Sequence, residues 1–252
     1  MNFTRDNLQV SVFTHRKLMG RAAANDISKC FAALLKEREE INVIFAAAPS
    51  QNDVLEALVA DKGVEWGRIN AYHMDEYIGL KPSAPQGFGN FLRRHIFSRV
   101  PFKSVNCIDA SAKNPEEEAE RYAKLLTDNP VDVVILGIGE NGHIAFNDPP
   151  VADFNDGKKV KAVELDDVCR RQQVNDGCFA HFNDVPKYAL TLTGPALTAA
   201  KYMFCIVPAE TKANAVYQTL NGSIGEHCPA TILRTHPAAR LYLDEKSAKL
   251  II

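Results

Sequence analysis

The chain has 252 residues, 46% of them hydrophobic and 24% charged, a balance typical of a globular protein that folds as one large domain. The formal net charge is −2, and no run of like charge is longer than Glu116–Glu118, so no nucleic-acid-binding surface is indicated. The N-terminus lacks a signal pattern, no apolar run approaches the ~18 residues of a membrane span, and the six cysteines lack the paired spacing of zinc sites. We therefore expect a cytoplasmic protein without nucleic-acid or membrane partners.

Short apolar runs alternate with segments of helical spacing along the chain. A helical stripe that ends near residue 35 precedes a buried strand over 41–45, and a second strand is expected over 68–74. A stripe from Phe88 to Ile96 predicts a helix, and Asn114 followed by Pro115 predicts the start of another. A further helix is expected over 210–220. The remaining expected strands cover 105–108, 131–136, 188–193, 202–207 and 240–243.

This alternation predicts an α/β fold: a doubly wound, mostly parallel sheet with helices on both faces. We expect a single domain over residues 1–252. Residues 147–187 are polar and weakly periodic, and they predict a lid or a long loop. Ligands of such sheets bind outside the carboxyl ends of the strands, so the segments that follow residues 45, 74 and 136 are the candidate sites.

After residue 45, small residues lead through Ser50 and Gln51 into a predicted helix. Backbone N–H groups at a helix N-terminus bind phosphate, and Ser50 adds a hydroxyl group. Simple capping of that helix by Ser50 or Asn52 is the alternative. Cations for an anionic ligand are available from Arg170, Arg171 and Lys212, each of which is otherwise a surface charge.

After residue 74, a predicted strand runs directly into Asp75 and Glu76. One carboxylate in a partly dry pocket can act as a base with a raised pKa. The alternative is a helix cap or a solvated turn.

After residue 136, three glycines have the G-x-G-x-x-G spacing of a dinucleotide-binding turn, with Gly139 at the centre. Such a turn needs a helix to begin at its third glycine, but Pro149 and the residue after it are prolines that prevent one. We expect instead a turn in which glycine lets the backbone approach a ligand. It would expose His143 for proton transfer, with Asn141 hydrogen-bonded to the imidazole and Asp148 facing it. A histidine that merely ties down the loop is the alternative.

Together these segments resemble the glucosamine-6-phosphate deaminase/isomerase family over nearly the whole chain. The related 6-phosphogluconolactonases share the Gly-x-x-Gly-His turn but lack the Met-Asp-Glu-Tyr segment, so the deaminase branch is favoured. The stretches that carry the resemblance are 74–80, 139–149, 185–191, 228–233 and 236–237.

The resemblance implies a modified doubly wound fold with no cofactor and no metal. The family opens the ring of an amino-sugar phosphate, moves a proton between C2 and C1, and releases a ketose phosphate and ammonia. By position, Asp75 would carry the proton, and His143 would open the ring with help from Asn141 and Asp148. The resemblance also implies a homo-oligomer. Phosphate or substrate contacts would come from Ser50, Gln51, Gly139, Arg170 and Lys212.

Three departures from the family pattern leave other functions open. Asn141 stands where the family has aspartate, Asp148 stands where it commonly has glutamate, and residues 47–51 replace its glycine-rich phosphate loop. The alternatives are another sugar epimer, plain aldose–ketose isomerisation, a lactonase-like hydrolase that uses His143, and a sugar-phosphate sensor without turnover.

Overall fold

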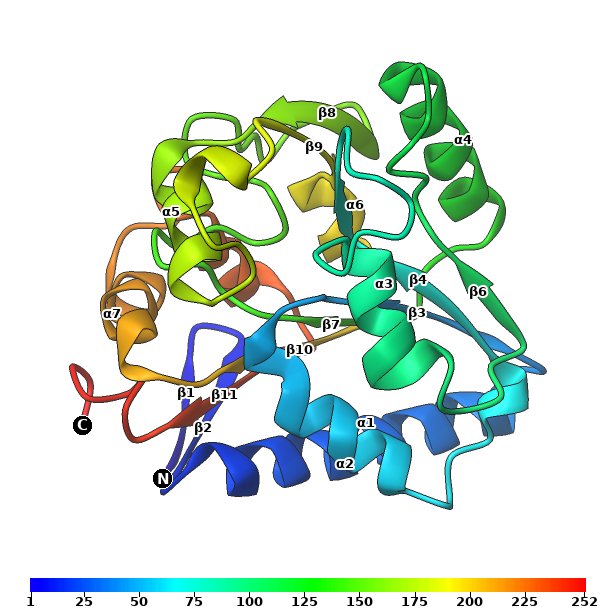
Figure 1. Ribbon diagram of the computed structural model, residues 1–252. Coiled ribbons are helices and arrows are strands. Elements are labelled where there is room, and N and C mark those ends of the chain that lie inside the picture. The colour runs from blue at the N-terminus through cyan, green and yellow to red at the C-terminus, as the bar shows by residue number, and fades with distance from the viewer.

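The computed structural model describes all 252 residues and contains an eight-stranded sheet in the order β1-β2-β11-β10-β7-β3-β4-β6 (Figure 1). All neighbouring strands of this sheet are parallel except β1 and β2, which confirms the expected sheet. Its strands are β1 (Asn2–Arg5), β2 (Leu8–Phe13), β3 (Ile41–Phe45), β4 (Ile69–His73), β6 (Ser104–Asn106), β7 (Val133–Leu136), β10 (Tyr202–Val207) and β11 (Ala239–Asp244).

A second, antiparallel sheet has the order β5-β9-β8 and lies above the first in Figure 1. It consists of β5 (Asp75–Tyr77), β8 (Val160–Glu164) and β9 (Tyr188–Leu192). The strand expected over 188–193 therefore belongs to this sheet and not to the parallel one. The expectation of a long loop over 147–187 is corrected too, because this stretch contains β8 and α5 (Asp167–Asn175). Helix α5 starts where the Asp166 side chain accepts from two backbone N–H groups, and polar residues fill it, so apolar periodicity does not reveal it.

Helices cover both faces of the large sheet, as expected. Successive residues of a strand point to opposite faces, and the core accordingly falls into two clusters of 34 buried residues each. On one face, Val43 and Phe45 pack with α1 (Arg16–Glu37), α2 (Asn52–Ala60) and α3 (Phe88–Leu92). On the other, Ile44 belongs to the cluster of α4 (Pro115–Asp128), α6 (Gly194–Thr198), α7 (Ala213–Asn221) and the second sheet.

The order of the strands places the candidate segments at one edge. From β3 the chain moves outward through β4 to β6, and it then returns to β7 on the other side of β3 before moving to β10. The sheet therefore reverses its winding between β3 and β7, which is where open α/β sheets bind ligands. The loops after β10, β7, β3 and β4 all leave from this carboxyl edge.

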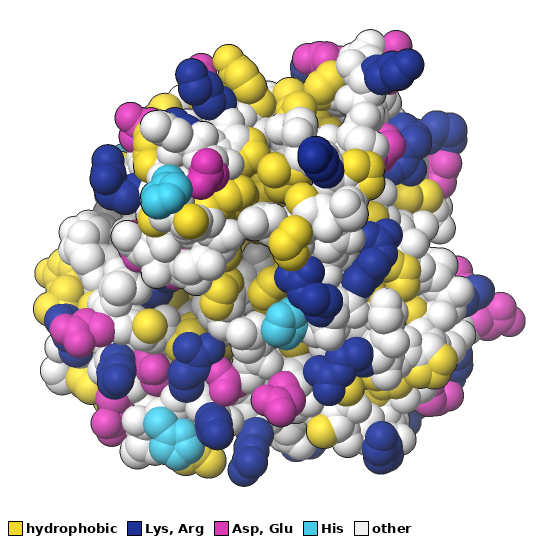
Figure 2. Space-filling model, viewed as in Figure 1, with side chains coloured by type: hydrophobic (Ala, Val, Ile, Leu, Met, Phe, Trp, Pro, Cys, Tyr) yellow, Lys and Arg dark blue, Asp and Glu magenta, His cyan; other side chains and the backbone are white.

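No helix is long and apolar enough to cross a membrane. Basic and acidic side chains are interspersed over the face shown in Figure 2, in keeping with the small net charge.

Helix α4 is connected to the carboxyl edge by one buried hydroxyl group. Its N-terminus is capped as predicted, because the Asn114 side chain accepts from the backbone N–H groups of Glu116 and Glu117. The Tyr122 hydroxyl lies 3.1 Å from the backbone nitrogen of His73 and 3.0 Å from its carbonyl oxygen. It is also 3.1 Å from the carbonyl oxygen of Asn106. One phenol thus ties α4 to the ends of β4 and β6.

Removing this hydroxyl in Tyr122→Phe is expected to lower the free energy of unfolding by about 1–3 kcal/mol, because buried backbone groups lose a partner. Tyr188→Phe is the matched control, since Tyr188 is about half exposed and such a change usually stays within ~0.5 kcal/mol. Urea unfolding of both variants measures the difference. Equal stabilities of the two variants would show that the Tyr122 bonds contribute nothing.

Candidate active site

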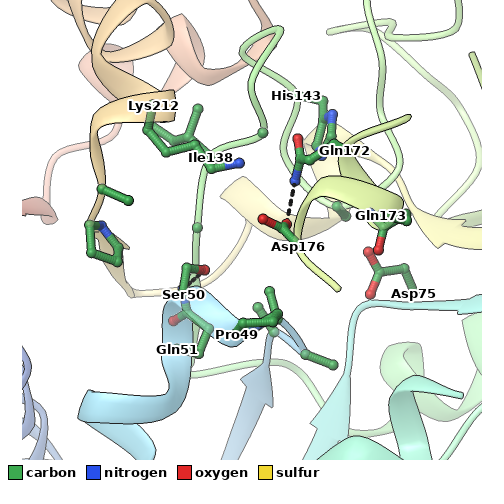
Figure 3. A pocket seen from close by; sticks show the side chains of 18 of the residues that line it. Pro49, Ser50, Gln51, Asp75, Ile138, His143, Gln172, Gln173, Asp176 and Lys212 are labelled. Atoms are coloured by element: carbon green, nitrogen blue, oxygen red, sulfur yellow. Dashed lines mark hydrogen bonds between the residues drawn. The ribbon is translucent and has the colours of Figure 1, made fainter. Parts of the chain in front are cut away.

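A pocket opens at the carboxyl edge between the loops after β3, β4, β7 and β10, and α5 forms one wall (Figure 3). Its empty volume, counting the open mouth, is about 850 Å³, within the range of small-molecule sites. Of the residues predicted from the sequence, it brings together Ser50, Gln51, Asp75, Gly139, His143 and Lys212.

The His143 imidazole is held from one side by two acceptors. Its Nδ1 lies 2.8 Å from Asn141 Oδ1 and 2.9 Å from Asp148 Oδ1. The Asn141 amide nitrogen donates to the same Asp148 oxygen at 2.8 Å, and the His143 backbone N–H donates to Asn141 Oδ1. Two acceptors at Nδ1 place a proton on that nitrogen, so Nε2 of the neutral ring is free to exchange a proton with a ligand. The contacts predicted for Asn141 and Asp148 are confirmed.

Asp148 is fully buried and is stabilised as a carboxylate. Burial alone would raise its pKa, but the charge and hydrogen bond of His143, with further bonds from Asn141 and the Cys169 thiol, lower the pKa below its usual value. His143, Asp148 and Cys169 have possible metal-ligand atoms within 4.8 Å of one another. However, burial raises the pKa of the Cys169 thiol well above its usual value, and a thiol must lose its proton to bind a metal. The trio therefore suits a hydrogen-bonded network better than a metal site.

The glycines of this loop make room for the histidine. A Cβ at Gly139 would lie 2.2 Å from the His143 ring, so the imidazole occupies the space that any other residue would fill. Gly142 has a φ of +85°, and a Cβ there would lie 2.5 Å from Cys228 Sγ. No helix begins at Gly142, which confirms that the G-x-G-x-x-G spacing is not a dinucleotide-binding turn.

Asp75 and Glu76 have different roles although they are neighbours. The Glu76 carboxylate accepts from the backbone N–H groups of Tyr77, Phe88 and Gly89 at 2.9–3.0 Å and so caps α3. The Asp75 carboxylate is buried, lines the pocket, and has no hydrogen-bond partner among the protein's side chains or backbone. Burial, and then the charge of Glu76, raise the pKa of Asp75 well above its usual value. The capping alternative thus applies to Glu76, and Asp75 is left free to take up a proton.

The other end of the pocket is suited to an anion. The turn η1 (Pro49–Gln51) leads into α2, and neither element has a side-chain cap, so the capping alternative for Ser50 and Asn52 is wrong. The Ser50 hydroxyl faces the pocket, whereas the Gln51 amide turns inward and donates to Ser50 Oγ and to the Ile206 carbonyl.

Lys212 lies opposite, and its side chain is almost completely buried. Burial lowers the pKa of Lys212, although the nearby carboxylates of Asp176 and Glu140 act against this shift. The preceding Ala209 has a φ of +84°, a costly backbone conformation for alanine, and its N–H is held by Asp244. This turn directs Lys212 to the pocket.

Arg170 is not brought to the pocket. Its guanidinium donates to the backbone carbonyls of Phe182 and Val185 at 3.2 and 3.0 Å and stacks 4.1 Å above the Phe182 ring. These contacts hold the segment after α5, so the side chain is not available for phosphate. Arg171 is exposed and also lies over Phe182.

Sequence reasoning missed two pocket residues on α5, one at its C-cap and one on α1. Gln172, Gln173 and the C-cap Asp176 form the α5 wall, and Arg16 lines the pocket and is paired with Asp53. The available signal was the spacing of Gln172 and Asp176, which are four residues apart and so share one helix face. Because no helix was predicted over these residues, the spacing did not indicate that the two side chains share a face.

Comparisons with known proteins agree with this geometry. The model of the glucosamine-6-phosphate isomerases/6-phosphogluconolactonase family matches residues 14–242. A glucosamine-6-phosphate deaminase of Exiguobacterium sibiricum is 33% identical over 86% of this chain and 84% of its own, and one of Listeria welshimeri is 31% identical over 84% and 88%.

Among solved structures, a monomeric glucosamine-6-phosphate deaminase superposes with a TM-score of 0.86 and 25% identity, over 96% of this chain and 99% of its own. The 6-phosphogluconolactonase of Thermotoga maritima shares the fold, with a TM-score of 0.77 and 21% identity over 94% and 99%. The family match spans most of the chain and includes all the loops that form the pocket. The chain belongs to the glucosamine-6-phosphate isomerase/6-phosphogluconolactonase family.

Proposed function

We propose that this protein converts glucosamine-6-phosphate, or a close epimer, to a ketose 6-phosphate and ammonia. The observation that carries the proposal is the buried, unpartnered Asp75 carboxylate in the same pocket as the His143 imidazole. A hydrolytic lactonase needs no base for a carbon-bound proton, whereas an aldose–ketose conversion does. The deaminases named above, at 31–33% identity, support the same choice.

The phosphate would bind between η1 and Lys212. Uncapped backbone N–H groups and the Ser50 hydroxyl supply hydrogen bonds, and the Lys212 ammonium supplies a positive charge. Arg170 is held elsewhere, and Arg16, which also lines this end, is paired with Asp53, so we assign the phosphate charge to Lys212. Binding here directs the sugar ring toward Asp75 and His143 (Figure 3).

Ring opening requires proton transfer between the C1 hydroxyl group and the ring oxygen. His143 would perform it through Nε2, because Nδ1 is already bound by Asn141 and Asp148. The Asp148 carboxylate stabilises the imidazolium that forms when the ring takes the proton.

Asp75 would then remove the proton from C2 and return it to C1. Its raised pKa makes it a stronger base than an ordinary carboxylate, which suits this step. The resulting imine at C2 adds water, the C–N bond breaks, and ammonia leaves the ketose phosphate. The overall reaction consumes one water molecule and needs no redox change.

The cellular setting and assembly belong to the same proposal. All six cysteines are free thiols, as is usual in the reducing cytoplasm.

We further propose that the α5 segment closes over the bound sugar as a lid, since α5 forms one pocket wall. A homo-oligomer remains part of the proposal through the family resemblance.

The direct test is ammonia release from glucosamine-6-phosphate, with galactosamine-6-phosphate in parallel and ketose phosphate followed in the same samples. We expect ammonia and ketose phosphate in equal amounts from at least one of the two sugars, and the faster sugar identifies the substrate. Ketose phosphate without ammonia from an aldose phosphate would indicate plain isomerisation instead. Absence of product, with ligand-induced thermal stabilisation, would favour the sensor.

Asp75→Asn is expected to lower kcat by ~100-fold or more and to retain sugar-phosphate binding. The amide keeps the shape of the side chain but cannot take up the C2 proton. The measurements are kcat for ammonia release and Kd by calorimetry. Asp128→Asn, at an exposed position on α4, is the control. A variant that keeps more than a tenth of the wild-type rate of ammonia release would refute the assignment of Asp75 as the base.

Gly139→Ala is expected to lower kcat by on the order of 100-fold, because the new Cβ displaces the imidazole that lies over this residue. Gly157→Ala is the matched control, since a Cβ there has no neighbour within 4 Å. Ammonia release is measured for both, after circular dichroism has established that both fold. Wild-type activity of Gly139→Ala would show that the position of His143 does not limit the reaction.

A further inference from the structure

Helix α5 presents two neighbouring glutamines to the pocket, and only one of them has partners within the protein. Gln172 Oε1 accepts from the backbone N–H of Glu140 at 2.8 Å, and its amide nitrogen donates to Asp176 at 3.3 Å. Gln173 is equally buried, at 7% exposure, yet its side-chain amide makes no hydrogen bond within the protein. In Figure 3 it lies beside Asp75 in the pocket.

Polar groups in a largely buried side chain are nearly always hydrogen-bonded, by the protein, by water or by a ligand. The Gln173 amide does not face the protein interior, because it lines the open pocket. Its partner is thus supplied from the pocket itself. Gln172 bonds to Glu140 in the loop of His143, so in this position of α5 Gln173 lies opposite the reacting groups.

The position of Gln173 indicates which part of a substrate it meets. Lys212 and Ser50 lie at one end of the pocket, and Asp75 and Gln173 lie together at the other. A sugar with its phosphate at the first end brings C1 and C2 to the second. His143 handles the oxygen of C1 and Asp75 acts at C2, so the nearest remaining polar groups are the amino group on C2, which leaves as ammonia, and the hydroxyl on C3, which stays on the sugar throughout. A primary amide both donates and accepts, as a hydroxyl does.

We propose that Gln173 is a specificity-determining residue that hydrogen-bonds the C3 hydroxyl group of the sugar phosphate and so positions C2 against Asp75. This inference rests on the proposed function and adds a substrate contact to it. The side chains involved are the free amide on α5 and the unpartnered carboxylate at the start of β5.

The test is a thermodynamic cycle in which the Gln173 amide and the C3 hydroxyl group are removed separately and then together. Gln173→Met keeps the length of the side chain without its hydrogen bonds, and 3-deoxy-glucosamine-6-phosphate lacks the hydroxyl group. We expect Gln173→Met to lower kcat/KM for glucosamine-6-phosphate by about 10- to 100-fold. The kcat/KM of the wild type should fall by a similar factor when the deoxy sugar replaces glucosamine-6-phosphate. The kcat/KM of the variant should fall by no more than about twofold on the same change of sugar.

Asn175→Ala is the matched control, because it removes an exposed amide from the same helix. Inorganic phosphate binding, followed by calorimetry, should be unchanged in both variants. The proposal is overturned if the variant loses the same factor on the deoxy sugar as the wild type does. It is also overturned if Asn175→Ala or phosphate binding is affected equally, since displacement of α5 would then explain the loss.

Failure of the proposed function is recognised separately. If the wild type releases no ammonia, the same cycle is run with Kd values for glucosamine-6-phosphate and its 3-deoxy form. If Gln173→Met and removal of the C3 hydroxyl each weaken binding, and the two together weaken it no further, the contact is supported without the reaction. If the two losses of affinity add up, the contact is refuted. If neither sugar binds the wild type, both the function and the contact are refuted.

Discussion

Buried polar groups at the carboxyl edge of the sheet must be hydrogen-bonded within the protein or by a ligand, and this constraint separates supporting side chains from reactive ones. Glu76 satisfies it through three backbone N–H groups, and Oδ1 of Asp148 satisfies it through His143 and Asn141. Asp75 and Gln173 have no hydrogen-bond partner within the protein, and their polar atoms are open to the pocket. Both line the same pocket, which is why the chemistry and the substrate contact are both proposed there.

The same constraint explains why the histidine is precisely oriented without a second carboxylate. Asn141 offers its oxygen to His143 and its amide nitrogen to Asp148, so one neutral side chain satisfies both neighbours. An aspartate at this position would bring two carboxylate oxygens into contact, and one of them would have to take up a proton. Two of the three departures noted with the family resemblance, Asn141 and Asp148, are therefore compatible with each other in this chain.

Backbone geometry supports the site as much as side-chain chemistry does. The imidazole of His143 lies against Gly139, and the turn that carries it is closed by the positive φ of Gly142 and the contact with Cys228. At the end of the pocket proposed to bind phosphate, the strained Ala209 precedes Lys212, whose side chain lines the pocket. Strain of this kind persists only where the surrounding structure holds it, and here Asp244 does so.

The amino-acid sequence by itself determined the parallel sheet, the strands β3, β7 and β10, the cap at Asn114 and the three loops of the site, because apolar periodicity and capping are local signals. It also predicted the contacts of Asn141 and Asp148 with His143, which are close in the chain. Only the tertiary structure decided that Arg170 is held by distant carbonyls, that Glu76 is a cap while Asp75 is free, and that α5 brings Gln173 into the pocket. Those outcomes depend on which groups meet across the fold, and a helix of polar residues that faces a pocket has no apolar stripe to reveal it.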